Sequence, residues 1–144
     1  MIDKDILLSK AHRVNRHVRR LKEKTPPTVH EFLSALDLQD IVLFNLQMAI
    51  QNCIDMASHV ISDEGLGMPG STNEMFYMLQ ENGYISQELA EKMVAAVGFR
   101  NLVVHEYAKI DLEEVYRISQ DHIDDLLDFL RALLKHIGLE PEKQ

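Results

Sequence analysis

The sequence predicts an all-α protein, an up-and-down bundle of four to five helices. Apolar residues recur at every third or fourth position through several long segments, which aligns them on one face of a helix. Only four prolines and six glycines occur in 144 residues. Several segments open with Ser, Thr or Asp followed three positions later by Glu, a pattern typical of helix starts. A chain of this length is expected to form one domain, residues 1–144, around a single core.

The first helix is expected over residues 4–24, where apolar residues form one narrow stripe. Roughly opposite that stripe lie four basic residues, Arg13, Arg16, Arg20 and Lys24. A charged face of this kind is typical of a helix side exposed to solvent. It would also suit a surface that follows an RNA backbone and binds phosphates without sequence preference. Both interpretations stay open from the sequence.

Two consecutive prolines end that helix, and Thr28 caps a short helical turn expected at 29–35. The next long helix is expected over residues 38–62, with Asp37 as its cap. This segment is apolar almost all round, so we expect it to be buried on more than one side.

A polar set lies within the apolar side of that second long helix. Asn45, Asn52 and His59 follow one another at seven-residue spacing, with Asp55 close by. Each of them can be a core group whose hydrogen bonds are satisfied by the backbone or by water. We also consider that Asn52 or Asp55 faces the basic residues of the motif helix described below, across a groove.

Two more helices are expected to begin after serine caps. The helix after Ser71 reaches about Asn82, where Gly83 supplies the stop. The helix after Ser86 carries the residues that point to function. Gly98 lies inside it, weakens it by roughly 1 kcal/mol relative to Ala, and allows a bend.

The last helix is expected over residues 112–137. Asp111 and Glu114 form its capping box, and Gly138 and Pro141 end the fold. Its inner face is rich in leucine. Four acidic residues are expected on its outer face: Asp121, Asp124, Asp125 and Asp128.

Four chemically active side chains lie close together near the end of the motif helix. Arg100 falls in the middle of an apolar stripe, and a guanidinium there must be paired or must open onto a polar cleft. Asn101 and His105 share a neighbouring face, and Tyr107 follows two turns beyond Arg100 at nearly the same angle. The stripe consists of Leu89, Met93, Ala96, Val103 and Val104.

The net charge of −8 is unevenly distributed. Residues 1–24 hold eight Lys/Arg and three acids, whereas the remaining residues hold seven Lys/Arg and twenty acids. Because nucleic-acid binding depends on the local patch, the acidic total does not exclude RNA. The acidic body also suits a basic protein partner.

Targeting and redox features indicate a cytoplasmic protein. No stretch approaches the roughly 18 apolar residues of a membrane span, and the start of the chain lacks a signal-peptide pattern. Cys53 is the single cysteine, so no internal disulfide can form. Membrane attachment is not expected.

Arg100, four further residues, His105, one further residue and Tyr107 form the pattern R-x-x-x-x-H-x-Y. With Asn101 directly after the arginine and an all-α chain of this length, the pattern resembles HEPN domains. It is most similar to the HepT toxins of HepT–MntA toxin–antitoxin pairs, over roughly residues 3–137. The resemblance implies a metal-independent, cofactor-free endoribonuclease that acts as a homodimer with a shared cleft, in a type VII-like toxin–antitoxin pair.

The resemblance also implies roles for individual residues. His105 would act as general acid or base, Arg100 would stabilise the charge that builds on the phosphorane, and Asn101 would orient the site. In HepT–MntA pairs the antitoxin is a minimal nucleotidyltransferase that transfers AMP from ATP, here onto Tyr107. Bulky adenylates at that position would keep RNA out of the cleft. Messenger and transfer RNA are both plausible substrates.

The spacing of the motif raises a geometric point. Arg100 and His105 are five residues apart, about 140° around an ideal helix. To act on one phosphate they need a bend, a long arginine reach, or pairing across a dimer, which would make the active site composite.

Other functions compete with this interpretation. A non-catalytic helical interaction or nucleotide-binding module could keep the same residues for structure, with Tyr107 as a core aromatic and Arg100 paired to Glu106 or Asp55. A metallohydrolase is disfavoured because no His, Asp or Glu set has ligand spacing. Cys53 lies among apolar neighbours without a base nearby in the sequence, which disfavours cysteine nucleophilic catalysis.

Overall fold

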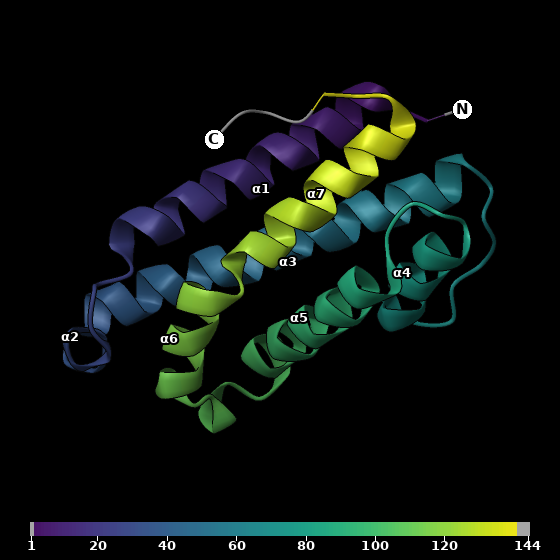
Figure 1. Cartoon of the computed structure of the whole chain (residues 1–144). Helices are drawn as coiled ribbons and strands as arrows, with labels where there is room; N and C mark the ends of the chain where they lie inside the picture. The colour runs from purple at the N-terminus through teal and green to yellow at the C-terminus, as the bar shows by residue number, and fades with distance from the viewer. Residues whose placement is uncertain (1, 141–144) are drawn as a thin grey trace.

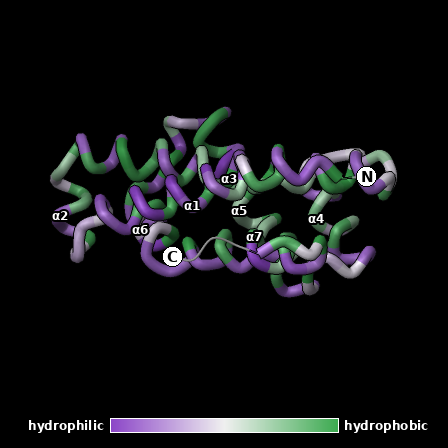
Figure 2. The backbone as a smooth tube through the Cα atoms, turned by 90° about the horizontal axis from the view of Figure 1, so that it is seen from above, coloured by the Kyte–Doolittle hydropathy of each residue, from purple (hydrophilic) through white to green (hydrophobic). Residues whose placement is uncertain are grey.

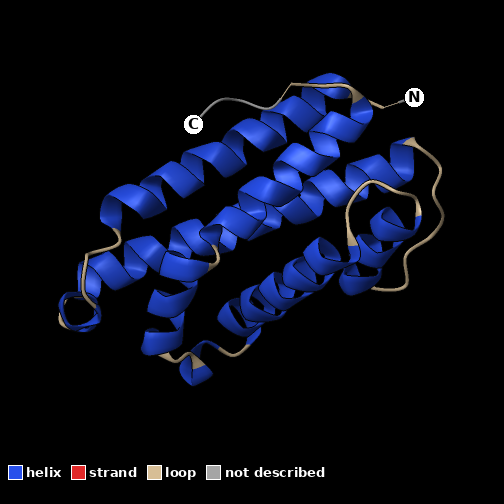
Figure 3. Ribbon diagram, viewed as in Figure 1, coloured by secondary structure: helices blue, strands red, loops and turns tan. Residues whose placement is uncertain are grey.

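A computed structural model describes residues 2–140, and helices make up nearly all of this part of the chain (Figure 3). The elements are α1 (Lys4–Lys24), α2 (Val29–Leu33), α3 (Leu36–Asp63), α4 (Thr72–Glu81), α5 (Gln87–His105), the 3-10 turn η1 (Tyr107–Lys109), α6 (Leu112–Asp121) and α7 (Ile123–Ile137). No strand occurs within residues 2–140. The predicted all-α bundle is confirmed, with seven α-helices within residues 2–140 in place of the four to five expected.

The long helix α3 is the centre of the bundle. Helices α1 and α5 lie on opposite sides of it, and α7 crosses in front (Figure 1). Figure 2 shows α1 as a largely hydrophilic tube, whereas hydrophobic residues predominate in α3. Half of the 28 residues of α3 are buried, so the expected burial on more than one side is confirmed.

Side-chain caps start most helices where the sequence predicts them. Ser71 accepts a hydrogen bond from the Glu74 amide (3.1 Å), and Ser86 accepts one from the Leu89 amide (3.1 Å). The predicted cap at Asp37 is wrong, because α3 begins at Leu36, two residues before the predicted start, and Ala35 stands at the cap without a side-chain hydrogen bond. Asp37 lies instead in the first turn, where its charge still favours the helix N-terminus.

The predicted last helix is interrupted at His122. Helix α6 ends at Asp121 and α7 begins at Ile123. The break lets α6 turn toward α2, where the Tyr116 hydroxyl donates to the Pro26 carbonyl (2.8 Å). Tertiary contacts of α6 therefore override the continuous helical pattern.

In the last segment the predicted helix stop is confirmed, whereas the predicted helix start is confirmed only in part. At the start, Asp111 accepts from the Glu113 amide (3.0 Å), so the cap is confirmed but the capping box with Glu114 does not form. At the end, Gly138 adopts φ +87°, the left-handed conformation that stops α7. Pro141 lies outside the described residues.

Candidate functional site

The motif residues lie at the C-terminal end of α5, which is continuous from Gln87 to His105. No break occurs at Gly98. Tyr107 lies in η1 rather than in the helix, so its predicted alignment with Arg100 is wrong. The tyrosine is 59% exposed, and its hydroxyl is accessible to another molecule.

The buried stripe of α5 differs from the predicted one. The buried residues of α5 include Phe99 and the predicted Val103, whereas Val104, also predicted to belong to the stripe, is 41% exposed. Arg100 lies between Phe99 and Val103 in the chain and is half-buried. Asn101 and His105 are exposed at the same end of the helix.

Arg100 meets no carboxylate in the part of the chain that the structure describes. Its Nη1 donates to Asn101 Oδ1 (3.0 Å), while its Nε is buried without a hydrogen-bond acceptor. The two acids considered as partners are engaged elsewhere: Glu106 pairs with Lys109 (3.0 Å) and Asp55 with Lys10 (3.3 Å). The structural ion-pair interpretation of Arg100 is therefore wrong. A half-buried guanidinium without a carboxylate partner keeps its positive charge available to an oxyanion.

His105 and Asn101 are exposed on the same end of the helix. His105 is the last residue of α5, and its ring makes no hydrogen bond with another described residue. Because α5 is uninterrupted, Arg100 and His105 keep the wide angular separation expected of an ideal helix. Two of the three explanations remain, the long arginine reach and a site composed from two chains.

The polar set of α3 is satisfied within the bundle. Asn45 and Asn52 donate to the carbonyls of Ile41 and Met48, both at 2.8 Å, as expected for core amides. Asp55 accepts from Gln51 (2.9 Å) in addition to its ion pair with Lys10 of α1. The structure therefore brings neither Asn52 nor Asp55 into contact with Arg100 or His105, and the groove hypothesis gains no support.

Helix α1, which carries the basic residues, lies on the other side of α3 from α5 (Figure 1). Arg13 and Arg16 are exposed, whereas Arg20 and Lys24 are half-buried. Arg20 also pairs with Glu23 (3.3 Å). This surface remains a predicted RNA contact.

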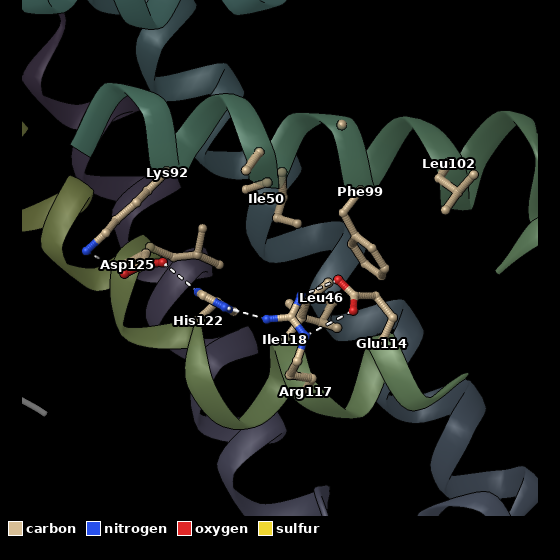
Figure 4. Close-up of a pocket in the computed structure, with 14 residues that line it drawn as sticks. Leu46, Ile50, Lys92, Phe99, Leu102, Glu114, Arg117, Ile118, His122 and Asp125 are labelled. Carbon is tan, nitrogen blue, oxygen red and sulfur yellow. Dashed lines mark hydrogen bonds and ion pairs between the residues drawn. The ribbon is translucent and has the colours of Figure 1, made fainter. Parts of the chain in front are cut away.

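A second feature, which sequence reasoning missed, is a cavity of about 520 Å³ beneath α5 (Figure 4). It lies between α5 on one side and α6 and α7 on the other. The sequence signal was the run of small residues in α5, which leave the space unfilled. Its apolar and small lining residues are Leu46, Ile50, Ala95, Ala96, Gly98, Phe99, Leu102, Ile118 and Leu126.

Five charged or polar side chains at the mouth of the cavity form a connected series, which we call the polar rail: Glu114, Arg117, His122, Asp125 and Lys92. Arg117 donates through Nε and Nη2 to both oxygens of Glu114 and through Nη1 to His122 Nε2 (3.0 Å). His122 Nδ1 lies 3.3 Å from Asp125, which is 3.6 Å from Lys92. Since arginine can only donate, His122 Nε2 accepts and Nδ1 carries the proton. The expectation that Asp125 points outward is wrong.

The polar rail changes the titration of its members. Hydrogen bonding from Arg117 lowers the pKa of the Glu114 carboxyl below its usual value. The hydrogen bond to Glu88, followed by the charge of Asp125, raises the pKa of Lys92. Both shifts favour the charged forms, so the rail is a set of compensated ions.

Three further findings concern the alternatives. The described residues contain no group of three or more His, Cys, Asp or Glu side chains placed to hold a metal ion. Burial raises the pKa of the Cys53 thiol far above its usual value, so this cysteine is unsuited to nucleophilic catalysis. None of the helices within residues 2–140 has the length and apolar character needed to cross a bilayer.

Comparisons with known proteins agree with the resemblance to HepT toxins. The mRNA nuclease HepT of Shewanella oneidensis is 32% identical over 129 residues, which cover 90% of this chain and 96% of that protein. The tRNA nuclease HepT of Aphanizomenon flos-aquae is 29% identical over 115 residues, 80% of this chain and 78% of that protein.

A similar solved structure is a tri-AMPylated HEPN toxin of Shewanella oneidensis in complex with an MNT antitoxin. It has 31% identity and a TM-score of 0.84, with 91% of this chain and 98% of that chain covered. The family model described as ribonuclease HepT-like matches residues 14–133. The chain therefore belongs to the HepT-like ribonuclease family.

Proposed function

We propose that this chain is the ribonuclease toxin of a toxin–antitoxin pair and that it cleaves RNA without a metal ion through Arg100 and His105. The observation that carries the proposal is the half-buried Arg100, which has an unused Nε donor and no carboxylate partner among the described residues. An exposed imidazole lies on the same helix end. Such a cation has its charge free for a phosphate, and the imidazole can move a proton beside it.

The reaction follows from these groups. The ribose 2′-oxygen attacks the neighbouring phosphorus while an imidazole removes its proton, and the bond from phosphorus to the 5′-oxygen breaks as that oxygen receives a proton. The products are a 2′,3′-cyclic phosphate and a 5′-hydroxyl. Arg100 stabilises the negative charge that builds on the phosphorane, and Asn101 holds the guanidinium in place through the 3.0 Å hydrogen bond.

The active site is proposed to be composite, because Arg100 and His105 of one chain diverge around the uninterrupted helix α5. In a homodimer, His105 of each chain can serve as base and acid in turn with Arg100 of the other chain. A mixture of Arg100→Leu and His105→Ala chains tests this: after subunit exchange, one site of each mixed dimer regains both wild-type residues. Recovery of cleavage supports the composite site, whereas a mixture as inactive as its components contradicts it.

Tyr107 is proposed as the site of neutralisation by a minimal nucleotidyltransferase of the MntA type. Its phenol oxygen would attack the α-phosphorus of ATP, releasing pyrophosphate and leaving AMP on the ring. The exposed position of Tyr107, two residues beyond His105, makes it accessible and close to the catalytic imidazole. The added phosphodiester would repel RNA and obstruct the cleft.

The decisive test is RNA cleavage by the purified chain in the presence of EDTA. We expect 2′,3′-cyclic phosphate ends, and a fall of about 10²–10⁴-fold in rate for His105→Ala with an unchanged melting temperature. His30→Ala, an exposed histidine of α2, is the matched control. Loss of cleavage with EDTA would contradict the metal-independent mechanism. A folded but inactive wild-type chain would favour the interaction module.

The neutralisation step has its own readout. Co-expression with a nucleotidyltransferase partner should add the mass of one or more AMP groups to the chain, and Tyr107→Phe should abolish the additions. Tyr77→Phe removes another partly exposed phenol and should leave the mass additions intact. AMP found on Tyr107→Phe would assign the modification elsewhere. Messenger and transfer RNA, the substrates named for the two HepT relatives, are the RNAs to test first.

A further inference from the structure

Helices α1 and α3 run side by side (Figure 1), and a groove of about 320 Å³ lies along their contact. It shares no lining residue with the cavity beneath α5. The groove combines an aromatic ring with guanidinium groups at the surface of the bundle. The lining residues that matter here are Arg16, His17 and Arg20 of α1 and Asp40, Phe44 and Asn45 of α3.

We propose that this groove binds a single-stranded segment of RNA, with one base stacked on the Phe44 ring and the neighbouring phosphates at Arg16 and Arg13. The inference rests on the proposed function in one respect, that RNA is the ligand. It adds a binding site whose residues take no part in the R-x-x-x-x-H-x-Y motif, and this binding can be measured without cleavage.

Phe44 presents a large aromatic surface to solvent. Its side chain is 57% exposed, although half of the residues of α3 are buried. The ring of His17 lies against it, with centroids 6.0 Å apart and planes inclined at 74°. An edge-to-face contact of this kind covers at most one face of the phenyl ring, so the other face is available to a nucleobase. Stacking of bases on exposed aromatic rings is a common way of binding single strands, and it tolerates different sequences.

The imidazole beside Phe44 is held in place by the core of the bundle. His17 Nδ1 lies 2.9 Å from Asn45 Oδ1, and Asn45 Nδ2 donates to the Ile41 carbonyl (2.8 Å). Since the amide oxygen of Asn45 can only accept, His17 Nδ1 carries the proton. Phe44 is therefore supported by a side chain that is ordered before RNA arrives, which lowers the entropy cost of binding.

Arg16 and Arg13 have their charge available for phosphates. Both side chains are exposed, and neither forms a hydrogen bond or an ion pair with another described residue. Arg16 lines the groove, and Arg13 lies three residues before it on the same helix. Arg20 also lines the groove but is paired with Glu23 (3.3 Å), so we assign it no phosphate.

The charge around the groove places the RNA backbone on its α1 side. Residues 1–24 hold eight Lys/Arg and three acids. Asp40 is the acid that lines the groove, and it lies on α3, one turn before Phe44. A polyanion is therefore attracted to α1 and repelled from the edge of α3, while the base reaches across to the ring.

An exposed apolar ring also suits a contact with another protein, but the surroundings of Phe44 favour RNA. Apart from the half-buried Ile41, every other side chain that lines the groove is polar or charged. A protein contact driven by apolar burial needs a contiguous apolar patch, which these residues do not supply.

Fluorescence anisotropy with a labelled single-stranded RNA tests the stacking, in the full chain carrying His105→Ala so that cleavage does not interfere. Phe44→Leu keeps an apolar side chain and removes the ring, and we expect RNA affinity to fall about 5- to 100-fold. Phe44→Trp keeps a stacking surface and should bind at least as tightly as the parent chain. Tyr77→Leu, which removes a partly exposed ring of α4, is the matched control and should bind as the parent does. Equal affinity in Phe44→Leu and the parent overturns the proposal.

The same assay over a range of salt concentrations tests the phosphate contacts. Arg16→Gln and Arg13→Gln should each weaken binding and make the slope of log affinity against log salt shallower by about 0.7. Arg131→Gln, an exposed arginine of α7 outside the groove, should leave the slope unchanged. Slopes that stay at the parent value in both Arg16→Gln and Arg13→Gln overturn the proposal.

Two further readouts separate this inference from its alternatives. Light scattering measures the oligomeric state of Phe44→Leu, and a change of state together with lost RNA affinity assigns the face to a contact between copies of the chain and overturns the proposal. RNA bound through Phe44 by a wild-type chain that does not cleave supports the groove and contradicts the ribonuclease. Cleavage by the wild type, with RNA affinity indifferent to Phe44→Leu, keeps the ribonuclease and overturns the groove.

Discussion

On the cavity side of α5 each cation meets a carboxylate, whereas on the motif side Arg100 meets none among the described residues. Arg117 is held by Glu114, and Lys92 lies between Glu88 and Asp125. Arg100 has only the amide oxygen of Asn101. Lys92 and Arg100 belong to the same continuous helix α5, whereas Arg117 and Glu114 lie on α6. The difference shows that the chain leaves a charge uncompensated at one place, although compensation is available within the same fold.

Removing the uncompensated charge should separate activity from stability. Arg100→Leu is expected to lower RNA cleavage by about 10²–10³-fold, because the phosphorane loses its cation. The same change should raise the free energy of unfolding by up to about 1 kcal/mol, since a half-buried unpaired charge is replaced by an apolar group. Cleavage assays and urea unfolding measure the two effects. The control is Arg131→Leu, which removes an exposed arginine near Asp128 and should leave cleavage unchanged. A loss of stability in Arg100→Leu would show that Arg100 has a structural role.

Supplying the missing carboxylate should make the motif side resemble the cavity side. Asn101→Asp places an anion where the amide oxygen now lies 3.0 Å from Arg100. We expect cleavage to fall roughly 10- to 100-fold, which corresponds to about 1.4–2.7 kcal/mol of repulsion between the new carboxylate and the phosphate. Asn101→Ala adds no charge and should reduce the cleavage rate less. Measuring both variants over a range of salt concentrations distinguishes the effect of charge from the effect of side-chain orientation. Equal losses in both variants would mean that Asn101 acts by orientation alone.

Gly98→Ala should affect stability without affecting cleavage. The added methyl group meets nothing within 4 Å, and alanine is favoured over glycine inside a helix by roughly 1 kcal/mol. Urea unfolding should show a gain of that order, with RNA cleavage within twofold of the wild type. A large loss of cleavage would indicate that the helix must bend at this residue during the reaction.

The smallest effect is expected on the pH dependence of stability, through the Glu114 carboxylate of the polar rail. The folded-state pKa of Glu114 is lowered, so its pairing stabilises the fold above the usual value near 4.5 and this contribution is lost as pH falls through the lower folded value. Glu114→Gln should therefore be slightly less stable than the wild type at neutral pH and equal to it in strong acid. The effect is small because the carboxylate is 45% exposed and screened by water. Unfolding curves at the two pH values provide the measurement, and a difference that grows in acid would contradict the sign.

The sequence predicted the helices well where local signals decide the structure. Caps such as Ser71 and Ser86 act on the next turn only, so they could be recognised without the fold. The interruption at His122 could not, because it depends on contacts between Tyr116 and the α1–α2 connection, about 90 residues away in the chain. Periodicity alone continues through that point.

The motif could be recognised from its residue types and spacing, without knowledge of its geometry. Arg100, Asn101 and His105 were identified by residue type and spacing, and the structure places all three at the exposed end of α5. Tyr107 was placed wrongly, since the helix ends before it and the angular argument no longer applies. The missing ion-pair partner of Arg100 and the cavity under Phe99 required coordinates, because both depend on which distant side chains come near.

The break at His122 has a consequence for the motions of the protein on slow timescales. Helix α7 buries seven side chains, whereas α6 buries only Val115 and Ser119. Amide hydrogens in a weakly buried helix exchange with solvent through local opening, while those of a core helix exchange only when the whole domain unfolds. A continuous helix would have tied the two segments into one cooperative unit. The amides of α6 are therefore expected to exchange with solvent faster than those of α7.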